Sequence, residues 1–167
     1  MKRSAQTPAP MPDPEIKKLH ALVGRWTSQV ELKPGPLGPG GKITHEFTGQ
    51  MILGGFFFQG RWREKGVRGE RRGFLIDGYD PVNKSFTSSW YMDDGSTVSG
   101  VLTISGNTYT WDGRFVLAGK PVLFRDIFVL APDRMSWTVK AESSVDGKTW
   151  TPLSDGKYTK TKPAPRK

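Results

Sequence analysis

The sequence predicts an all-β protein: a lipocalin-like, antiparallel up-and-down β-barrel of about ten strands with one short N-terminal helix. Apolar and polar residues alternate along most of the chain, which is typical of strands that have one buried face. Twenty glycines and thirteen prolines favour many short strands joined by turns over a helical bundle. Short links between successive strands favour a meander, and closure into a barrel leaves no exposed edge.

The chain has 167 residues, which is enough for one domain with its own core. We expect residues 1–13 to form a disordered, proline-rich leader, residues 14–162 to form the barrel and residues 163–167 to form a basic tail. No apolar run follows the basic residues near the start, and none approaches the ~18 residues of a membrane span. The compartment stays open: cytoplasmic as the chain stands, or exported if a signal peptide has been removed.

The helix is expected over Pro14–Val23. Asp13 suits the capping position, and Pro14 suits the first helical position. Gly24 then ends the helix. The apolar residues of the helix share one face: Ile16, Leu19, Leu22 and Val23.

Ten strands are expected, separated by turn signals such as Asp80-Pro81 and Gly106-Asn107. They lie near residues 25–33, 43–51, 56–62, 70–79, 86–92, 98–104, 108–116, 122–131, 135–141 and 149–160. A β-sandwich is the alternative, but it usually needs a long crossover link. The longest loop in the sequence is Pro34–Gly41, which favours the barrel.

The alternation predicts which side chains point into the barrel. Aromatic residues dominate this set. The set also includes Phe74 and Ile76. A barrel of this size holds either a packed core or one small ligand, and both interpretations stay open. Four glycines share the inward parity, where they either remove volume or mark bends of the strands: Gly49, Gly60, Gly100 and Gly113.

Two polar features interrupt the apolar interior. His45 alternates in step with the inward residues of its strand, so its imidazole is expected to face the interior. There it binds a ligand, acts as a base or simply forms a hydrogen bond with a neighbouring side chain. Arg125 and Asp126 interrupt an apolar run, so one of them must face inward. A buried charge needs a partner, either a charge of another strand, such as Glu70 or Arg72, or a ligand anion.

The net charge of +9 is concentrated in the segment 157–167, which carries +5, and in the segment 61–72, which carries +4. Basic tails are usually solvated, but such charge also suits nucleic acid or an anionic surface. A tryptophan between two arginines, such as Trp62, is typical of proteins that bind single-stranded nucleic acid. The alternation of its strand, however, points Trp62 into the barrel, where it cannot stack on a base. We therefore expect no specific nucleic acid as a partner.

Residue counts exclude several kinds of site. The chain has no cysteine and only two histidines, His20 and His45, which excludes disulfides, cysteine-bound zinc and three-histidine metal sites. No Gly-x-Ser-x-Gly motif marks a nucleophile. We expect no metal and no cofactor.

A helix that runs into Gly24-x-Trp26 and a first strand resembles the start of lipocalin-like (calycin) barrels. In those barrels the tryptophan closes one end, and a basic residue of the last strand packs over it. The resemblance implies this role for Trp26, with Lys157 or Lys160 as the basic residue.

A longer series of motifs resembles a bacterial family of unknown function with a lipocalin-like barrel, distantly similar to nitrobindins. The resemblance covers about residues 16–162, and the family carries no established activity. Nitrobindins ligate haem through a histidine near the C-terminal end, but no histidine follows His45 here, so no such haem site is expected. The motifs are Gly24-x-Trp26, Leu53–Phe57, Gly78–Asp80, Lys84-x-Phe86, Trp90, Asp146-Gly147 and Tyr158–Lys160.

The predicted function is the binding of one small apolar or amphipathic molecule in an aromatic-lined cavity. The alternative is an enzyme that uses the same cavity, with His45 or an inward carboxylate as general base. Nothing in the sequence indicates the oligomeric state. The residues expected to contact the ligand are His45, Phe47, Phe58, Trp62, Trp90, Trp111, Arg125 and Trp137.

Overall fold

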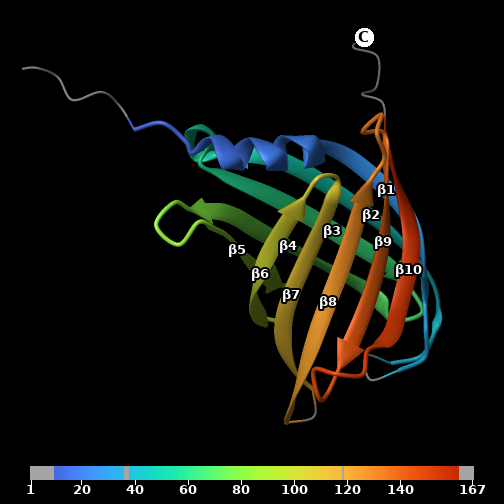
Figure 1. Ribbon diagram of the computed structural model, residues 1–167. Coiled ribbons are helices and arrows are strands. Elements are labelled where there is room, and N and C mark those ends of the chain that lie inside the picture. Colours follow the sequence, from blue (N-terminus) through green and yellow to red (C-terminus); the bar gives the residue numbers. More distant parts are fainter. Residues whose placement is uncertain (1–9, 36–37, 118, 162–167) are drawn as a thin grey trace, which may run out of the picture.

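Ten antiparallel strands close into a barrel in the computed structural model, which describes residues 10–35, 38–117 and 119–161 (Figure 1). Each strand pairs with its neighbours in sequence, and the first also pairs with the last, so the sheet has no free edge. The predicted fold class is confirmed. The strands are β1 (Gly24–Leu32), β2 (Gly41–Ile52), β3 (Phe57–Gly66), β4 (Gly69–Asp80), β5 (Ser85–Met92), β6 (Thr97–Ser105), β7 (Thr108–Leu117), β8 (Lys120–Leu130), β9 (Ser136–Ser144) and β10 (Thr151–Lys160).

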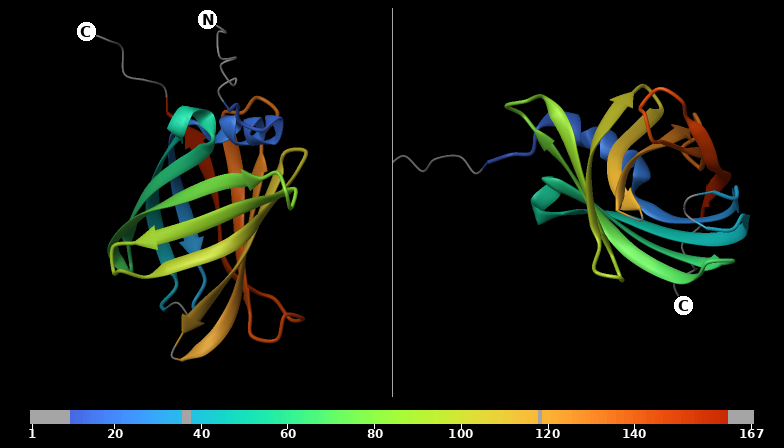
Figure 2. Two further views of the ribbon diagram at one scale, coloured as in Figure 1. Left: turned by 90° about the vertical axis from the view of Figure 1, so that its left-hand side faces the viewer. Right: turned by 90° about the horizontal axis from the view of Figure 1, so that it is seen from below.

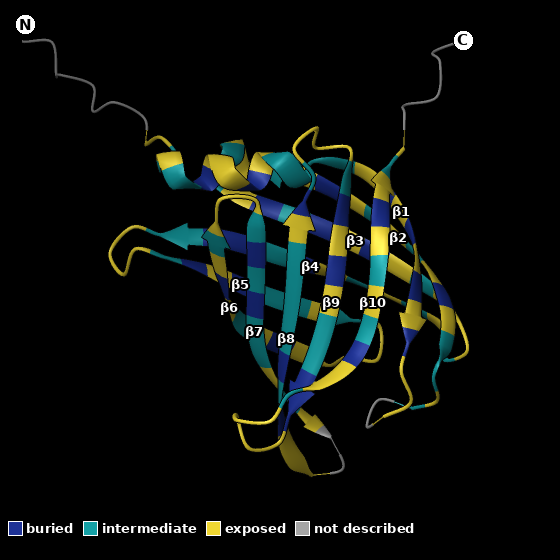
Figure 3. Cartoon of the chain, turned by 45° about the vertical axis from the view of Figure 1, so that its right-hand side comes forward, coloured by how far each residue is buried: buried dark blue, intermediate teal, exposed yellow. Residues whose placement is uncertain are grey.

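The alternation of the sequence reappears as burial along the strands (Figure 3). In β1 every second residue from Trp26 to Leu32 is buried, and the residues between them are exposed. The sheet therefore has one face in water and one face in the barrel interior. Residues 1–9 of the predicted leader and the whole predicted tail lie outside the described residues.

The predicted N-terminal helix is η1 (Pro14–Leu22), a 3-10 helix that lies across one end of the barrel (Figure 2). The Asp13 carboxylate accepts a hydrogen bond of 2.9 Å from the Glu15 amide and so caps the helix. Ile16 and Leu19 are buried. A second, single-turn helix, η2 (Leu53–Gly55), joins β2 to β3. No helix in the described ranges is long and apolar enough to cross a membrane.

Trp26 lies buried at the barrel end that η1 covers. Its side chain is 1% exposed, and its indole N–H donates a 3.0 Å hydrogen bond to the carbonyl of Leu22. Its ring centroid lies 4.0 Å from that of Trp137. Lys160 pairs with Trp26 across β1 and β10 and covers its ring, whereas Lys157 is exposed on the outer face opposite Gln29. Of the two expected lysines, Lys160 alone has the position that the resemblance implies.

The prediction of which β4 side chains point into the barrel is wrong. Phe74 is 39% exposed, whereas Leu75 and Asp77 are buried. The β3–β4 hairpin places Asp77 directly opposite Phe58, which points inward, so the two side chains share the interior face. Glu70 and Arg72 therefore do not have the inward parity that was expected of them.

The inward glycines provide space for aromatic rings of the wall. A Cβ atom added to Gly60 would lie 2.6 Å from two carbons of the Phe47 ring. A Cβ atom on Gly49 would meet Phe58 at similar distances, and Gly113 lies under Trp111. The rings lie flat over positions without side chains, so these glycines seat aromatic groups and do not simply enlarge the interior.

Candidate ligand cavity

The barrel encloses a cavity of about 640 Å³, to which all ten strands and η1 contribute side chains. This volume falls in the range of roughly 300–1,000 Å³ typical of small-molecule sites. Of the two interpretations that the sequence left open, the structure therefore shows a barrel with a hollow interior.

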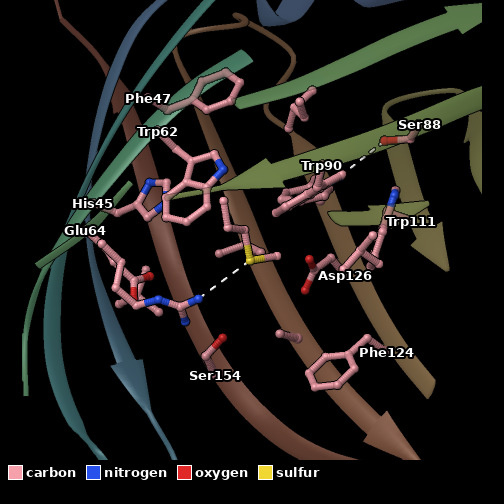
Figure 4. A pocket seen from close by; sticks show the side chains of 18 of the residues that line it. His45, Phe47, Trp62, Glu64, Ser88, Trp90, Trp111, Phe124, Asp126 and Ser154 are labelled. Carbon is pink, nitrogen blue, oxygen red and sulfur yellow. Dashed lines mark hydrogen bonds between the residues drawn. The ribbon is translucent and has the colours of Figure 1, made fainter. Parts of the chain in front are cut away.

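Seven of the eight residues expected to contact a ligand line this cavity, and all of them except His45 are phenylalanines or tryptophans. Figure 4 labels five of the seven: His45, Phe47, Trp62, Trp90 and Trp111. Trp90 and Trp111 are neighbours, with ring centroids 5.0 Å apart. The seven are His45, Phe47, Phe58, Trp62, Trp90, Trp111 and Trp137.

Arg125 is the exception, and its expected inward orientation is wrong. Its guanidinium donates a 2.7 Å hydrogen bond to Asp112 and lies 4.3 Å from the ring centroid of Trp150. Asp126 instead lines the cavity. The cause is the pairing of β7 with β8, which places Asp126 directly opposite the inward Trp111 and Arg125 opposite Asp112.

Two carboxyl groups face the interior. Burial raises the pKa of Asp126 to about 7, and burial also raises the pKa of Asp77 to about 7, against a smaller lowering by a hydrogen bond from Ser88. Both groups therefore change charge close to neutral pH. Sequence reasoning missed Asp77, although counting back from the β3–β4 turn places it opposite Phe58.

His45 is the one histidine of the cavity wall. Its ring lies 5.9 Å from Trp62 in a stacked arrangement and 5.4 Å from Tyr158 edge-on, and its Nδ1 is enclosed without a hydrogen-bond partner. Burial lowers the pKa of His45 to about 4, because the charged imidazolium loses its hydration. The imidazole is thus neutral at physiological pH and a weak base.

The cavity opens at the end opposite η1, where its lining includes residues of the β3–β4 and β5–β6 turns, namely Arg68, Asp94 and Ser96. We call this opening the mouth, and it is charged. Arg71 lies 3.7 Å from Asp94. Burial raises the pKa of Glu64, and the charges of Arg71 and Arg68 oppose that rise. Two of the mouth arginines, Arg68 and Arg71, therefore already face carboxylates. The mouth consists of Glu64, Arg68, Arg71, Asp94 and Arg114.

Metal binding has no obvious place in the described part of the chain. Within it, no group of three or more histidine, aspartate or glutamate residues is arranged to hold a metal ion.

Comparison with known proteins gives a family and a fold. Residues 11–160 match the model of a family described as "Protein of unknown function (DUF1579)". No curated protein matches the chain. The crystal structure of Rv2717c from M. tuberculosis is similar, with a TM-score of 0.63 and 11% identity over 91% of this chain and 100% of that chain. A de novo designed fluorescence-activating β-barrel has a TM-score of 0.43 and 12% identity over 85% of this chain and 95% of the design.

Proposed function

Since the chain belongs to the DUF1579 family, whose function is unknown, we propose a function from the cavity itself. The protein binds one small apolar or amphipathic molecule inside the barrel. The observation that carries the proposal is a hollow of about 640 Å³ whose walls are mainly apolar and rich in aromatic side chains. Such a hollow is the usual form of a small-molecule site, in which apolar walls supply affinity and a few polar groups fix the orientation.

The expected affinity is modest. Burial of about 300 Å² of apolar ligand surface contributes roughly 7 kcal/mol at ~25 cal/mol per Å². Association costs at least about 4 kcal/mol in lost freedom of motion, which the polar contacts and dispersion only partly offset. The net of about 3–7 kcal/mol corresponds to dissociation constants from millimolar to micromolar for simple apolar probes, and we expect tighter binding for the natural ligand.

Titration of the purified protein with a neutral fluorophore, N-phenyl-1-naphthylamine, tests the proposal. The test variant is Ala141→Phe, because Ala141 lines the cavity and a larger side chain fills part of it. The matched control is Lys140→Phe, which places the same side chain on the exposed face of the same strand. We expect saturable fluorescence in the parent and the control and a loss of at least tenfold in affinity in Ala141→Phe. Equal binding by all three proteins contradicts the proposal.

The resemblance to lipocalin-like barrels forms part of this proposal. The position of Lys160 over Trp26 supports it, because the same contact closes one barrel end in that group. The ligand then enters at the mouth, at the opposite end from the plug.

A second candidate function is an enzyme that uses the same cavity. The observation in its favour is the pair of interior carboxyl groups, Asp77 and Asp126, whose pKa values are raised to about 7, near the optimum for a general base. His45, the base expected first, is a weaker candidate because burial lowers its pKa to about 4. Mass spectrometry of ligands recovered after incubation with the parent and with Asp126→Asn distinguishes conversion from simple binding.

A nucleic-acid or anionic-surface role has less support. Trp62 is 9% exposed and points into the barrel, so it offers no stacking face. On the outer face, Arg63 pairs with Glu70, and Arg72 lies 3.8 Å from Asp93. An electrophoretic shift of single-stranded DNA that survives ~200 mM salt is the result that this role requires.

A further inference from the structure

We propose that the cavity selects amphipathic organic cations, and that Asp126 is the counter-ion of their ammonium group. This inference rests on the proposed binding function and names the class of ligand. It follows from the position of Asp126, from the aromatic groups around it and from the distribution of charge along the cavity.

Asp126 is an acid that has no cationic partner within the part of the chain that the structure describes. It lies in the middle of β8, opposite Trp111 on β7 and Ala141 on β9, and both of these residues also line the cavity. Figure 4 shows its carboxyl group projecting into the hollow beside Trp111. Among the described residues, the ion pairs include none with Asp126. A buried carboxylate without a partner is costly, and a bound cation removes that cost.

Aromatic rings surround the carboxyl group, and their faces attract cations. Trp90 and Trp111 form a tilted pair with centroids 5.0 Å apart. Tyr158 lies close to Asp126. Burial raises the pKa of the Tyr158 phenol most, and the negative charge of Asp126 raises it further. Aromatic walls and one carboxylate together form the usual site for substituted ammonium groups, where each favourable cation–π contact contributes about 0.5–2 kcal/mol.

The cavity lining does not share the strong positive charge of the whole chain. Its lining includes four carboxyl groups and three arginines, whereas the chain has a net charge of +9. The arginines belong to the mouth, where Asp94 and Glu64 face two of them. Deeper in the barrel the other titratable groups of the lining are Asp77, His45, Tyr109 and Tyr158, and none of them is a cation at pH 7. An anion placed there meets no compensating charge.

The test compares three ligands with the same phenylbutyl chain: 4-phenylbutyl-trimethylammonium, its neutral isostere with a tert-butyl group, and 5-phenylpentanoate as the anion. Isothermal titration at pH 8 measures each dissociation constant with the whole protein. We expect the parent to bind the ammonium ligand at least tenfold more tightly than the neutral isostere, and the anion most weakly.

The variant Asp126→Asn keeps the size of the side chain and removes its charge. We expect it to lose at least tenfold in affinity for the ammonium ligand and to bind the neutral isostere within about twofold of the parent. The control is Asp112→Asn, because Asp112 lies on the outer face and pairs with Arg125. Thermal melts confirm that all three proteins are folded.

The possible failures are distinguishable. Equal binding of the ammonium ligand and its neutral isostere, or tighter binding of the anion, overturns the selection of cations and leaves the binding function standing. Unchanged ammonium affinity in Asp126→Asn removes the assigned counter-ion. If none of the three ligands binds and the neutral fluorophore does not bind either, both proposals fall together.

Discussion

The ammonium nitrogen of Lys160 lies 5.0 Å from the centroid of the Trp26 ring, at the barrel end that η1 covers. The two residues pair directly across β1 and β10, the first and last strands of the sheet. The contact thus lies at the seam where the barrel closes. Trp26 also contacts the helix through the carbonyl of Leu22. One indole therefore connects the helix, the first strand and the last strand.

Replacement of Trp26 by alanine is expected to leave a marginal or insoluble protein. Truncation of a buried tryptophan typically costs about 3–5 kcal/mol, and a domain of this size usually has only about 5–15 kcal/mol in total. Urea unfolding followed by circular dichroism measures the loss. His45→Ala is the comparison, because it shortens a side chain at the cavity surface and is expected to keep the fold. A melting temperature of Trp26→Ala within a few degrees of the parent contradicts the plug assignment.

Gly60→Ala is expected to destabilise the barrel by about 1–3 kcal/mol, the usual cost of overpacking. The added methyl group would lie 2.6 Å from the Phe47 ring and 3.1 Å from Leu75, so the ring must move. Gly35→Ala is the control, because its nearest neighbour is a Leu153 methyl group at 3.6 Å, which is ordinary contact. Thermal melts compare the two variants. Equal melting temperatures would show that the Phe47 ring adapts without cost.

The fold was predictable because alternation is a local property of the chain. In β1 polar and apolar residues alternate strictly, and burial follows the same order. In β4 the run Phe74-Leu75-Ile76 is apolar throughout, so alternation there does not say which side chains point inward. The parity of β4 is instead set by its register with β3, in which Trp62 lies opposite Gly73 and Phe58 opposite Asp77. A one-residue error in register exchanges the two faces.

The aromatic residues of the candidate site could be predicted from the sequence, but its charged residues could not. The aromatic wall residues were found because they follow the parity of their own strands. The choice between Arg125 and Asp126 depends on the partner strand, because only the pairing of Trp111 with Asp126 turns the carboxyl group inward. The volume of the cavity depends on how rings such as Phe47 lie over glycines, which no spacing within one strand reveals.

Tyr109→Phe is expected to loosen η1 with little effect on the barrel. The Tyr109 hydroxyl donates a 2.8 Å hydrogen bond to the carbonyl of Lys18 and so joins β7 to the middle of the helix. Loss of such a bond typically costs about 0.5–1.5 kcal/mol. Hydrogen exchange is expected to become faster in the helix and to stay unchanged in the strands. Faster exchange throughout the barrel would assign Tyr109 a global role.

Asp126 is expected to make the protein less stable as the pH rises. Burial raises its pKa in the folded protein to about 7, above its usual value of 3.8, so the folded state binds more protons than the unfolded state between these values. Its contribution to stability is therefore complete below pH ~3.8 and is lost as the pH rises through 7. Asp77 acts in the same direction, because its pKa is also raised to about 7. His45, whose pKa falls to about 4, acts in the opposite direction between about pH 4 and 6.5.

Asp126→Asn isolates this contribution. We expect the free energy of unfolding of the variant, minus that of the parent, to increase by about 2–3 kcal/mol between pH 5 and pH 8. Urea titrations at the two pH values measure the change, and Asp77 and His45 cancel because both proteins contain them. The control Asp112→Asn removes a carboxylate of the outer face that pairs with Arg125, where solvent screening keeps the effect small at both pH values. If the difference between Asp126→Asn and the parent is the same at pH 5 and pH 8, the carboxyl group is not held neutral by burial, and its role as an unpaired acid in the cavity is wrong.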